Sequence, residues 1–226
     1  MIIIIGLGPS TSSCISVGAY QIIRCAPTVF VRTSKHPAVA NLLEEGIHVQ
    51  SFDEIYETSS TFEEVYLRIA ETVVSKATCG DVVYAVPGHP LVGESSVQVL
   101  ISEAEKKGLA YKILGSESFI EACLESLRLN LDEGLKIINA LSMDKVKPSK
   151  DVGNLVYQVY DKCIASDVKL SLMEQYPDEF EIAIIRGEGL PEQRVQWLPL
   201  YLLDRQKFDH LTTLYIPPFN KSSKEE

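Results

Sequence analysis

A loop rich in proline and glycine is the part of this sequence best suited to hold a ligand. It lies in GDVVYAVPGHPLVGESSVQ, residues 80–98. Pro87 and Pro90 fix φ and remove two amide donors, while Gly88 can adopt conformations closed to other residues. His89 adds an imidazole that can form hydrogen bonds but supplies no fixed negative charge. The spacing predicts a stiff loop of fixed shape, although an ordinary strand-to-helix turn can also contain these residues.

Arg32, Lys35 and His36 form a compact basic group just after a predicted strand. Strand-end loops carry function more often than other surface, so this group is a candidate for binding an anionic substrate. Exposed surface charge is the commoner explanation for such a cluster. Both interpretations stay open at this point.

Side chains for other kinds of chemistry are missing or scattered. The sequence has no catalytic triad or carboxylate dyad, its four histidines lack metal-ligand spacing, and its five cysteines lack CxxC spacing. We therefore expect no metal site and reduced thiols in a cytoplasmic protein. The turn Gly6-Leu7-Gly8-Pro9 begins like a dinucleotide fingerprint, but Thr11 stands where the third glycine belongs.

The composition excludes several classes of protein. The chain has 226 residues, of which 46% are hydrophobic, which is enough for one large or two small cores. Its net charge of −10 argues against a broad surface for nucleic acid or an anionic membrane. The apolar run at residues 2–5 is too short for a signal peptide or a membrane span.

The elements that must position these loops alternate between strands and helices in the N-terminal half. Strands are predicted at residues 2–5, 28–32, 47–49, 82–86 and 111–114, and helices at 15–24, 38–45, 61–77 and 95 to about 108. The last helix is predicted to open with a capping box from Ser95 to Gln98. Such alternation is typical of a parallel sheet, whose carboxyl edge binds ligands.

The pattern changes after Gly115. A helix is predicted from Ser116 through Leu127, an apolar segment at 135–140, a strand at 155–159 and a helix at 164–173. Strand candidates then follow in succession at 181–186, 195–198 and 212–216, which indicates a mixed sheet. The predicted fold is α/β with two domains, residues 1–115 and 116–218, followed by a disordered tail at 219–226.

Several motifs occur in the order found in one known family. They are GLGP after the first strand, GDVVYAVPGHPLVGE, GSESF, LVYQVYD and IIRGEGLPEQRV. Together they resemble the tetrapyrrole (corrin/porphyrin) methylases, the class III methyltransferases that use S-adenosylmethionine (SAM), over about residues 1–218. VPGHPLVGE, IASDVKLSLMEQYPDEFE, YLLDR and HLTTLYIPP most resemble the methylase half of bacterial proteins fused to a MazG-type nucleotide pyrophosphohydrolase.

This resemblance implies a fold and a set of cofactor-binding residues. The family fold has a parallel-sheet N-terminal domain and a mixed-sheet C-terminal domain, with the ligand in the cleft between them. The residues implied for the SAM pocket are Pro9, Gly88, His89, Leu91, Val92, Glu117, Ser118, Gln158, Gly187 and Glu188. Two departures affect this set: most members have aspartate at the position of His89, and GSESF replaces a proline-glycine segment, so that Glu117 is expected to intrude on the pocket.

The resemblance also implies an activity. SAM carries an activated methyl group, so the protein has mainly to align an acceptor atom and exclude water, without an obligatory acid or base. The expected function is methyl transfer to an unidentified small molecule, tetrapyrrole-like or other, with S-adenosylhomocysteine as product. Relatives are usually homodimers, and no nucleic-acid or membrane partner is implied.

Two other functions stay open. One is a non-catalytic SAM-binding or regulatory module that partners a MazG-type pyrophosphohydrolase, as a domain or as a separate protein. The other is an unrelated α/β oxidoreductase that binds a nucleotide such as NAD. Retention of SAM but not NAD would dismiss the oxidoreductase.

Overall fold

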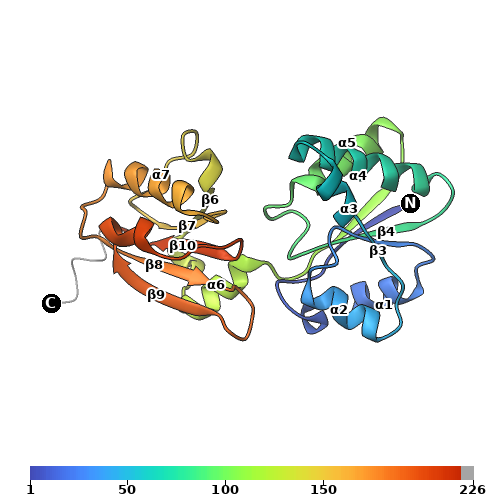
Figure 1. Cartoon of the computed structure of the whole chain (residues 1–226). Helices are drawn as coiled ribbons and strands as arrows, with labels where there is room; N and C mark the ends of the chain where they lie inside the picture. Colours follow the sequence, from blue (N-terminus) through green and yellow to red (C-terminus); the bar gives the residue numbers. More distant parts are fainter. Residues whose placement is uncertain (220–226) are drawn as a thin grey trace. The chain divides into compact units, whose positions relative to one another are not determined.

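A computed structural model describes residues 1–219 of the chain. The chain divides into two compact units, Met1–Phe119 and Ile120–Glu226, each with its own sheet (Figure 1). Of the tail predicted at 219–226, residues 220–226 lie outside the described part. Phe219 itself packs against Tyr176 and Phe180, with ring centroids at 5.9 and 5.7 Å.

The first unit is built on a parallel sheet of five strands in the order β3-β2-β4-β1-β5. The strands are β1 (Ile2–Gly6), β2 (Val29–Val31), β3 (Gln50–Ser51), β4 (Val82–Val86) and β5 (Tyr111–Leu114). Because all five run in one direction, their carboxyl ends meet at a single edge. The predicted parallel sheet is therefore confirmed.

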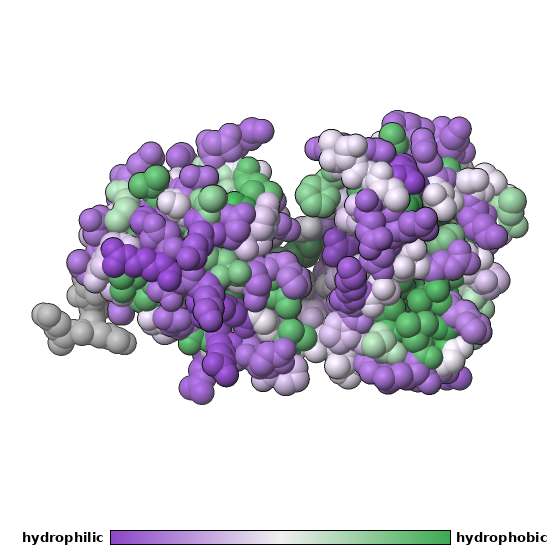
Figure 2. Space-filling view, in the orientation of Figure 1, coloured by the Kyte–Doolittle hydropathy of each residue, from purple (hydrophilic) through white to green (hydrophobic). Residues whose placement is uncertain are grey.

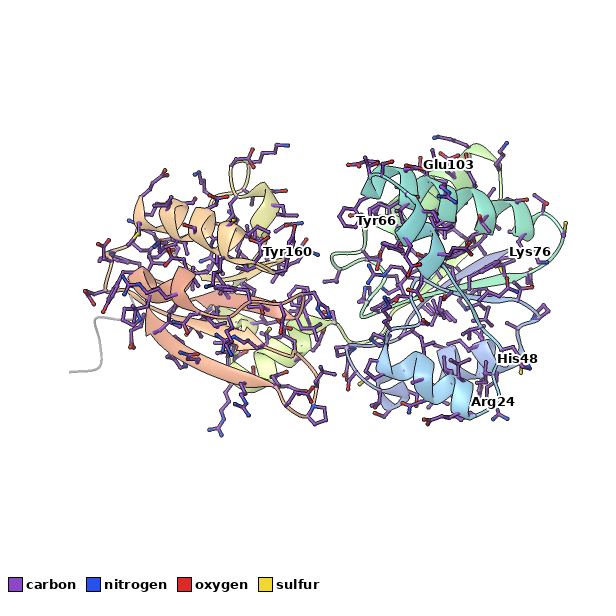
Figure 3. The ribbon with its side chains drawn as sticks, viewed as in Figure 1. Arg24, His48, Tyr66, Lys76, Glu103 and Tyr160 are labelled. Atoms are coloured by element: carbon purple, nitrogen blue, oxygen red, sulfur yellow. The ribbon has the colours of Figure 1, made fainter. Side chains whose placement is uncertain are left out.

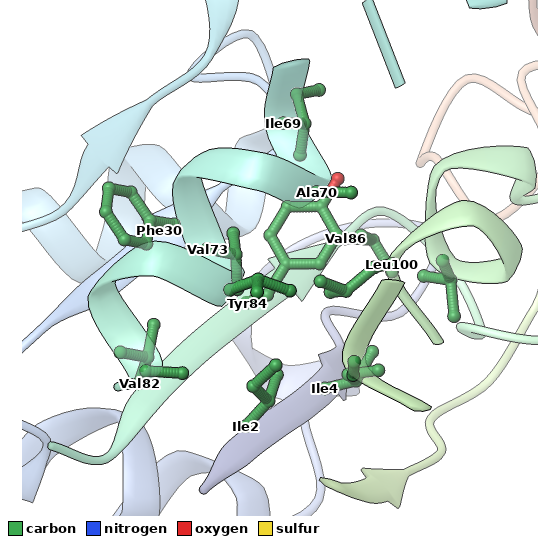
Figure 4. Packing of buried hydrophobic residues seen from close by; sticks show 14 of the residues in the cluster. Ile2, Ile4, Phe30, Ile69, Ala70, Val73, Val82, Tyr84, Val86 and Leu100 are labelled. Atoms are coloured by element: carbon green, nitrogen blue, oxygen red, sulfur yellow. The ribbon is translucent and has the colours of Figure 1, made fainter. Parts of the chain in front are cut away.

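Helices cover both faces of this sheet, which explains why β4 is apolar at every position. The helices are α1 (Val17–Cys25), α2 (Pro37–Glu44), α3 (Asp53–Thr58), α4 (Phe62–Ala77) and α5 (Ser95–Lys106). Val82, Tyr84 and Val86 pack under α4 and α5, whereas Val83 and Ala85 face α1 and α2. Figure 4 shows the Tyr84 ring among the buried side chains on the face of the sheet that α4 and α5 cover. Alternate residues of one strand thus enter two cores.

Three details of the first unit differ from the sequence-based prediction. The strand predicted at 47–49 is wrong, because Ile47 donates its amide to the Leu42 carbonyl at the end of α2, and pairing with β2 begins only at Gln50. Helix α3 was not predicted. The capping box at Ser95 is also wrong: the N-cap of α5 is Glu94, whose carboxylate accepts from the Ser96 amide.

The second unit contains a mixed sheet in the order β6-β7-β10-β8-β9. The strands are β6 (Leu135–Asn139), β7 (Gly153–Tyr157), β8 (Glu181–Arg186), β9 (Arg194–Pro199) and β10 (Thr212–Ile216). Strands β6 and β7 are parallel, while β10 runs antiparallel to both β7 and β8. The predicted mixed sheet is confirmed.

One face of the mixed sheet is covered by α7 (Lys162–Met173) together with the short 3-10 helices η3 (Ala140–Ser142) and η4 (Leu200–Arg205). Val168 and Leu172 of α7 pack with Ile182 and Ile184 of β8 in this core. The remaining elements of the unit are α6 (Phe119–Leu127) and η2 (Leu131–Glu133).

Several boundaries in the second unit differ from prediction, and the helix predicted at 164–173 and the strand predicted at 195–198 both begin earlier, at Lys162 and Arg194. The strand predicted at 155–159 lies two positions too late, because Gly153 already pairs with Leu135 and Gln158 turns out of the strand with φ of 67°. The helix predicted from Ser116 begins at Phe119.

Figure 2 shows a face of the molecule on which hydrophilic residues predominate. Within residues 1–219, no helix is long and apolar enough to cross a membrane.

Candidate functional site

Loops after four strands of the first unit meet at the carboxyl edge of its sheet. They are the turn after β1 (Gly6 to Pro9), the segment after β2 (Arg32 to His36), the proline and glycine loop after β4 (Pro87 to Glu94) and the segment after β5 (Gly115 to Ser118). Most of the residues predicted from sequence lie in these four loops. Open α/β sheets bind their ligands at this edge.

The loops after β1 and β4 are joined directly through their backbones. Gly8 donates its amide to the Gly88 carbonyl at 3.2 Å, and Gly88 donates its amide to the Gly8 carbonyl at 2.8 Å. Both glycines have positive φ, 75° for Gly8 and 62° for Gly88, which side chains other than glycine rarely adopt. The two predicted glycine loops therefore form one backbone unit.

Close packing beneath this bridge leaves no room for side chains. A Cβ on Gly6 would lie 2.5 Å from the Gly88 carbonyl oxygen and 2.9 Å from Cδ of Pro90. Ser116, in the segment after β5, donates its hydroxyl to the Cys14 carbonyl at 2.5 Å. These contacts hold the loops after β1, β4 and β5 against one another.

His89 is held by its own loop. Its Nδ1 accepts the Leu91 amide at 3.1 Å, and its carbonyl accepts the Val92 amide at 3.0 Å. Because Nδ1 is an acceptor, a neutral ring carries its proton on Nε2. The ring lies against Gly115, where any Cβ would collide with it. His89 therefore acts in this structure as an internal support of the loop and contacts the segment that leads to Glu117.

Gly88 provides open space on the site side of the bridge. A Cβ built on Gly88 would meet no atom within 4 Å, in contrast to the crowding at Gly6. Leu91 beside it is 52% exposed, and Pro9 and Val92 are partly exposed. An exposed apolar side chain next to open backbone is a surface on which a nucleoside can rest. These residues fit a cofactor held mainly by backbone groups.

Arg32 is already paired within the protein. Its Nε lies 3.2 Å from Oε2 of Glu94, a carboxylate with a side chain only 6% exposed. Glu94 was missed by the sequence reasoning, which assigned the start of the helix to Ser95. The available signal was an acidic residue directly after Gly93, where a helix N-terminus favours negative charge.

His36 and Lys35 have different surroundings. His36 is the N-cap of α2, and its Nδ1 accepts the Ala38 amide at 3.3 Å. Burial and the charge of Arg32 lower the pKa of His36 to about 4, against the effect of a hydrogen bond to the Gly8 backbone. Lys35 is exposed and makes no ion pair with any described residue. Lys35 is thus the cation of this group that remains available to an anionic ligand.

Asp53 was also missed, and it organises the loop after β2 from the first residue of α3, the helix that follows the adjacent strand β3. Its carboxylate accepts hydrogen bonds from the Thr33 hydroxyl at 2.6 Å and from the Ser34 amide at 2.8 Å. Although desolvation acts to raise it, these hydrogen bonds lower the pKa of Asp53 to about 2. No sequence signal identified this contact, because α3 itself was not predicted.

Glu117 and Ser118 follow β5 at the same edge. Glu117 is exposed, while Ser118 is 2% exposed. Their segment is held near the Gly8–Gly88 bridge because Gly115 packs against His89 and Ser116 donates to the Cys14 carbonyl. The first unit therefore brings together Pro9, Gly88, His89, Leu91, Val92, Glu117 and Ser118.

The other three predicted residues belong to the second unit. Gln158 follows β7, and Gly187 and Glu188 follow β8; both strands run antiparallel to β10 and therefore end at one edge of the mixed sheet. Gln158 is exposed and holds φ of 67°, a strained conformation for a non-glycine residue. Strain of this kind clusters at ligand sites.

Glu188 lies in a tight turn between two glycines of positive φ, Gly187 and Gly189. Its side chain is 3% exposed, and its Oε1 has no hydrogen-bond partner among the described residues. Burial raises the pKa of Glu188 to about 7, a shift that a hydrogen bond with Thr213 opposes. The nearby Cys123 thiol is buried as well, and its pKa is raised. A pKa of about 7 means that this carboxyl is partly protonated near neutral pH.

Within residues 1–219 no three His, Cys, Asp or Glu side chains are grouped so that they could hold a metal ion.

Comparison with known sequences gives a consistent family match. A family model described as tetrapyrrole (corrin/porphyrin) methylases matches residues 1–203. The chain is 37% identical over 223 residues to the "uncharacterized protein YabN" of Bacillus subtilis (strain 168). That match covers 97% of this chain but 45% of the relative, so the chain spans a little under half of its length.

Solved structures share the fold at low sequence identity. Uroporphyrin-III-C-methyltransferase from Thermus thermophilus superposes with a TM-score of 0.74 at 15% identity, covering 96% of this chain and 92% of that one. A diphthine synthase gives 0.72 at 20% identity, covering 96% and 89% of the two chains. The methyltransferase CobJ gives 0.71 at 18% identity, covering 96% and 93%.

Proposed function

Because this chain belongs to the tetrapyrrole (corrin/porphyrin) methylases, we propose that it is a SAM-dependent methyltransferase acting on a small molecule. The observation that carries the proposal is the backbone bridge between Gly8 and Gly88, with open space on Gly88. It supplies a rigid site made of main-chain groups at the edge where such sheets bind ligands.

The residues of the first unit that would hold the cofactor are Pro9, Gly88, His89, Leu91 and Val92, with Glu117 and Ser118 beside them. Leu91 offers apolar contact, and the backbone of the loop offers carbonyl groups whose positions are fixed before binding. A loop that is already ordered loses little conformational entropy on binding. Gln158, Gly187 and Glu188 are the residues that we propose from the second unit.

SAM supplies an activated methyl group when it is bound, so the protein needs no strong base. The side chains present would align the acceptor and exclude water from the methyl group. His89 is engaged through Nδ1, which leaves Nε2–H as a donor rather than a base. We therefore propose positioning, rather than proton abstraction, as the contribution of this chain.

Lys35 and His36, together with Arg32, are the proposed contacts for an anionic acceptor. Of these, Lys35 is the exposed cation, while Arg32 is paired with Glu94 and His36 is neutral near pH 7. Among Arg32, Lys35 and His36, Lys35 is the one that is charged near pH 7 and forms no ion pair within residues 1–219, which favours an acceptor bound at one focused positive point in a chain of net charge −10. A carboxylated acceptor, tetrapyrrole-like or other, suits this arrangement.

A second candidate function takes account of the length of the relative. The chain spans 45% of YabN, so a domain of this kind occurs joined to a further segment. As the alternative we propose a SAM-binding module that regulates a MazG-type pyrophosphohydrolase without methyl transfer; the length of the relative supports only the presence of a further segment.

Calorimetric titration with SAM, S-adenosylhomocysteine and NAD tests the proposal first. We expect dissociation constants below about 1 mM, the upper end of ordinary Michaelis constants, for SAM and its product, and no heat with NAD. Transfer of a labelled methyl group from SAM into a cell extract then separates an enzyme from a regulatory module. A protein that ignores SAM at millimolar concentration would refute both functions.

A further inference from the structure

A chain of polar contacts runs beneath the proline and glycine loop of the first unit. Glu94 Oε1 accepts from the Ser96 hydroxyl at 2.7 Å and from the Ser96 amide at 3.3 Å. The Ser96 hydroxyl also lies 2.7 Å from the hydroxyl of Tyr84, a fully buried residue of β4. Glu94 thus connects the start of α5 to the strand that precedes the loop.

The same carboxylate reaches the segment that follows a second strand, β2. Its Oε2 lies 3.2 Å from Arg32 Nε, and the Arg32 amide donates to the Ala85 carbonyl of β4 at 3.0 Å. The Tyr56 hydroxyl, from α3, is buried close to the same pair, and desolvation raises its pKa to about 12, an effect that Arg32 opposes. The ion pair therefore lies in a poorly hydrated place, where charge interactions are strong.

The segment Pro87–Gly93 is tied at both ends by these contacts. At one end it continues from β4, and at the other it passes into Glu94. We propose that Glu94 and Arg32 are positioning residues which hold this loop in its ligand-binding shape. The consequence for binding rests on the proposed function: cofactor affinity should depend on an ion pair whose two residues are not among the proposed cofactor contacts.

The charge of Glu94 matters separately from its role as a helix cap. In Glu94→Gln the side-chain oxygen can still accept from Ser96, so the cap is kept. Arg32, however, then has no negative partner for its half-buried guanidinium. Removing one member of such a pair leaves an uncompensated charge. We expect the loop to loosen while the strands remain intact.

Amide hydrogen exchange of the ligand-free protein tests this directly. The amides of Gly88, Leu91 and Val92 are bonded to Gly8, His89 Nδ1 and the His89 carbonyl. We expect these three to exchange at least tenfold faster in Glu94→Gln, with no change in the amides of β1 and β4. Equal acceleration of loop and strand amides would indicate general destabilisation and would overturn the inference, as would unchanged loop exchange.

Glu103→Gln is the matched control. Glu103 lies on α5 as well and pairs with Lys106 at 2.5 Å on the surface, away from the loop (Figure 3). The Glu103→Gln substitution removes one negative charge from α5, as Glu94→Gln does. Loop exchange and SAM affinity should stay within twofold of wild type in this variant; a change equal to that of Glu94→Gln would contradict the specific role of Glu94.

SAM titration of single and double variants tests whether Arg32 acts through Glu94. We expect about tenfold weaker binding in Glu94→Gln and in Arg32→Gln, and no further loss in the double variant, because the pair acts as one unit. A hundredfold loss in the double variant would show independent roles. If the wild type itself does not bind SAM, the proposed function fails, while the exchange pattern still decides whether the pair holds the loop.

Discussion

Gly8 and Gly88 face each other at the carboxyl ends of neighbouring parallel strands and exchange two backbone hydrogen bonds, of 3.2 and 2.8 Å. This exchange converts two separate loops into one rigid element. A ligand held by such an element contacts main-chain groups that do not have to be ordered on binding.

Gly88→Ala should reduce SAM affinity at least tenfold, because the new methyl group occupies open space at the site and strains a φ of 62°. Gly108→Ala is the control: Gly108 has φ of 64° and equally open surroundings, but follows the far end of α5. Each variant should lose about 1–2 kcal/mol of stability from backbone strain. Calorimetric titration with SAM, at equal fractions of folded protein, separates the loss of affinity from the loss of stability. Similar SAM affinities in the two variants would argue against a ligand at Gly88.

Gly6→Ala should disturb the bridge itself. Its Cβ would lie 2.5 Å from the Gly88 carbonyl oxygen, so we expect a loss of roughly 1–3 kcal/mol, as for other overpacked sites. Gly18→Ala in α1 has no neighbour within 4 Å of its new Cβ, and it should be neutral or stabilising by up to about 1 kcal/mol. Thermal unfolding of both variants measures the contrast. A Gly6→Ala protein as stable as wild type would show that the bridge adapts easily.

Glu188→Gln should remove a pH dependence of stability from the second unit. The folded state holds the Glu188 proton more tightly than the unfolded state, because the pKa is raised from 4.5 to about 7. Stability is therefore highest below pH 4.5 and falls by about 3 kcal/mol as pH rises through 7. Urea unfolding followed by the fluorescence of Trp197, the sole tryptophan in the sequence, reports on this unit. If Glu188→Gln shows the wild-type slope between pH 4.5 and 7, the carboxyl is not protonated in the folded state.

His36→Asn should remove the opposite dependence from the first unit. The pKa of His36 is lowered from 6.5 to about 4, so the unfolded state binds the proton more tightly in this window. Stability is present above pH 6.5 and is lost, by about 2–3 kcal/mol, as pH falls through 4. Asparagine can still accept the Ala38 amide and so preserves the cap. Far-ultraviolet circular dichroism in urea at pH 4.5 and 7 should show a smaller difference in the variant than in wild type.

Local sequence patterns were sufficient to predict the fold class of each half. The uncharged apolar run Val82–Val86 required a strand covered on both faces, and the alternation of strands and helices up to Tyr111 required a parallel sheet. Proline and glycine likewise predicted a stiff loop at residues 87–93, because these residues restrict or extend the local backbone whatever surrounds them. The β8 and β10 strands had the predicted bounds for the same local reason.

Which side chains and loops contact one another could not be predicted from local patterns. The pairing of Arg32 with Glu94, the bridge from Gly8 to Gly88 and the burial of Glu188 depend on strand order and on packing between segments distant in sequence. The prediction placed strand β3 at 47–49 instead of Gln50–Ser51 for the same reason: the position of the strand follows from its partner β2 and not from its own residues. Local propensity acts over a few residues, whereas charge pairing and burial are set by neighbours that a sequence does not name.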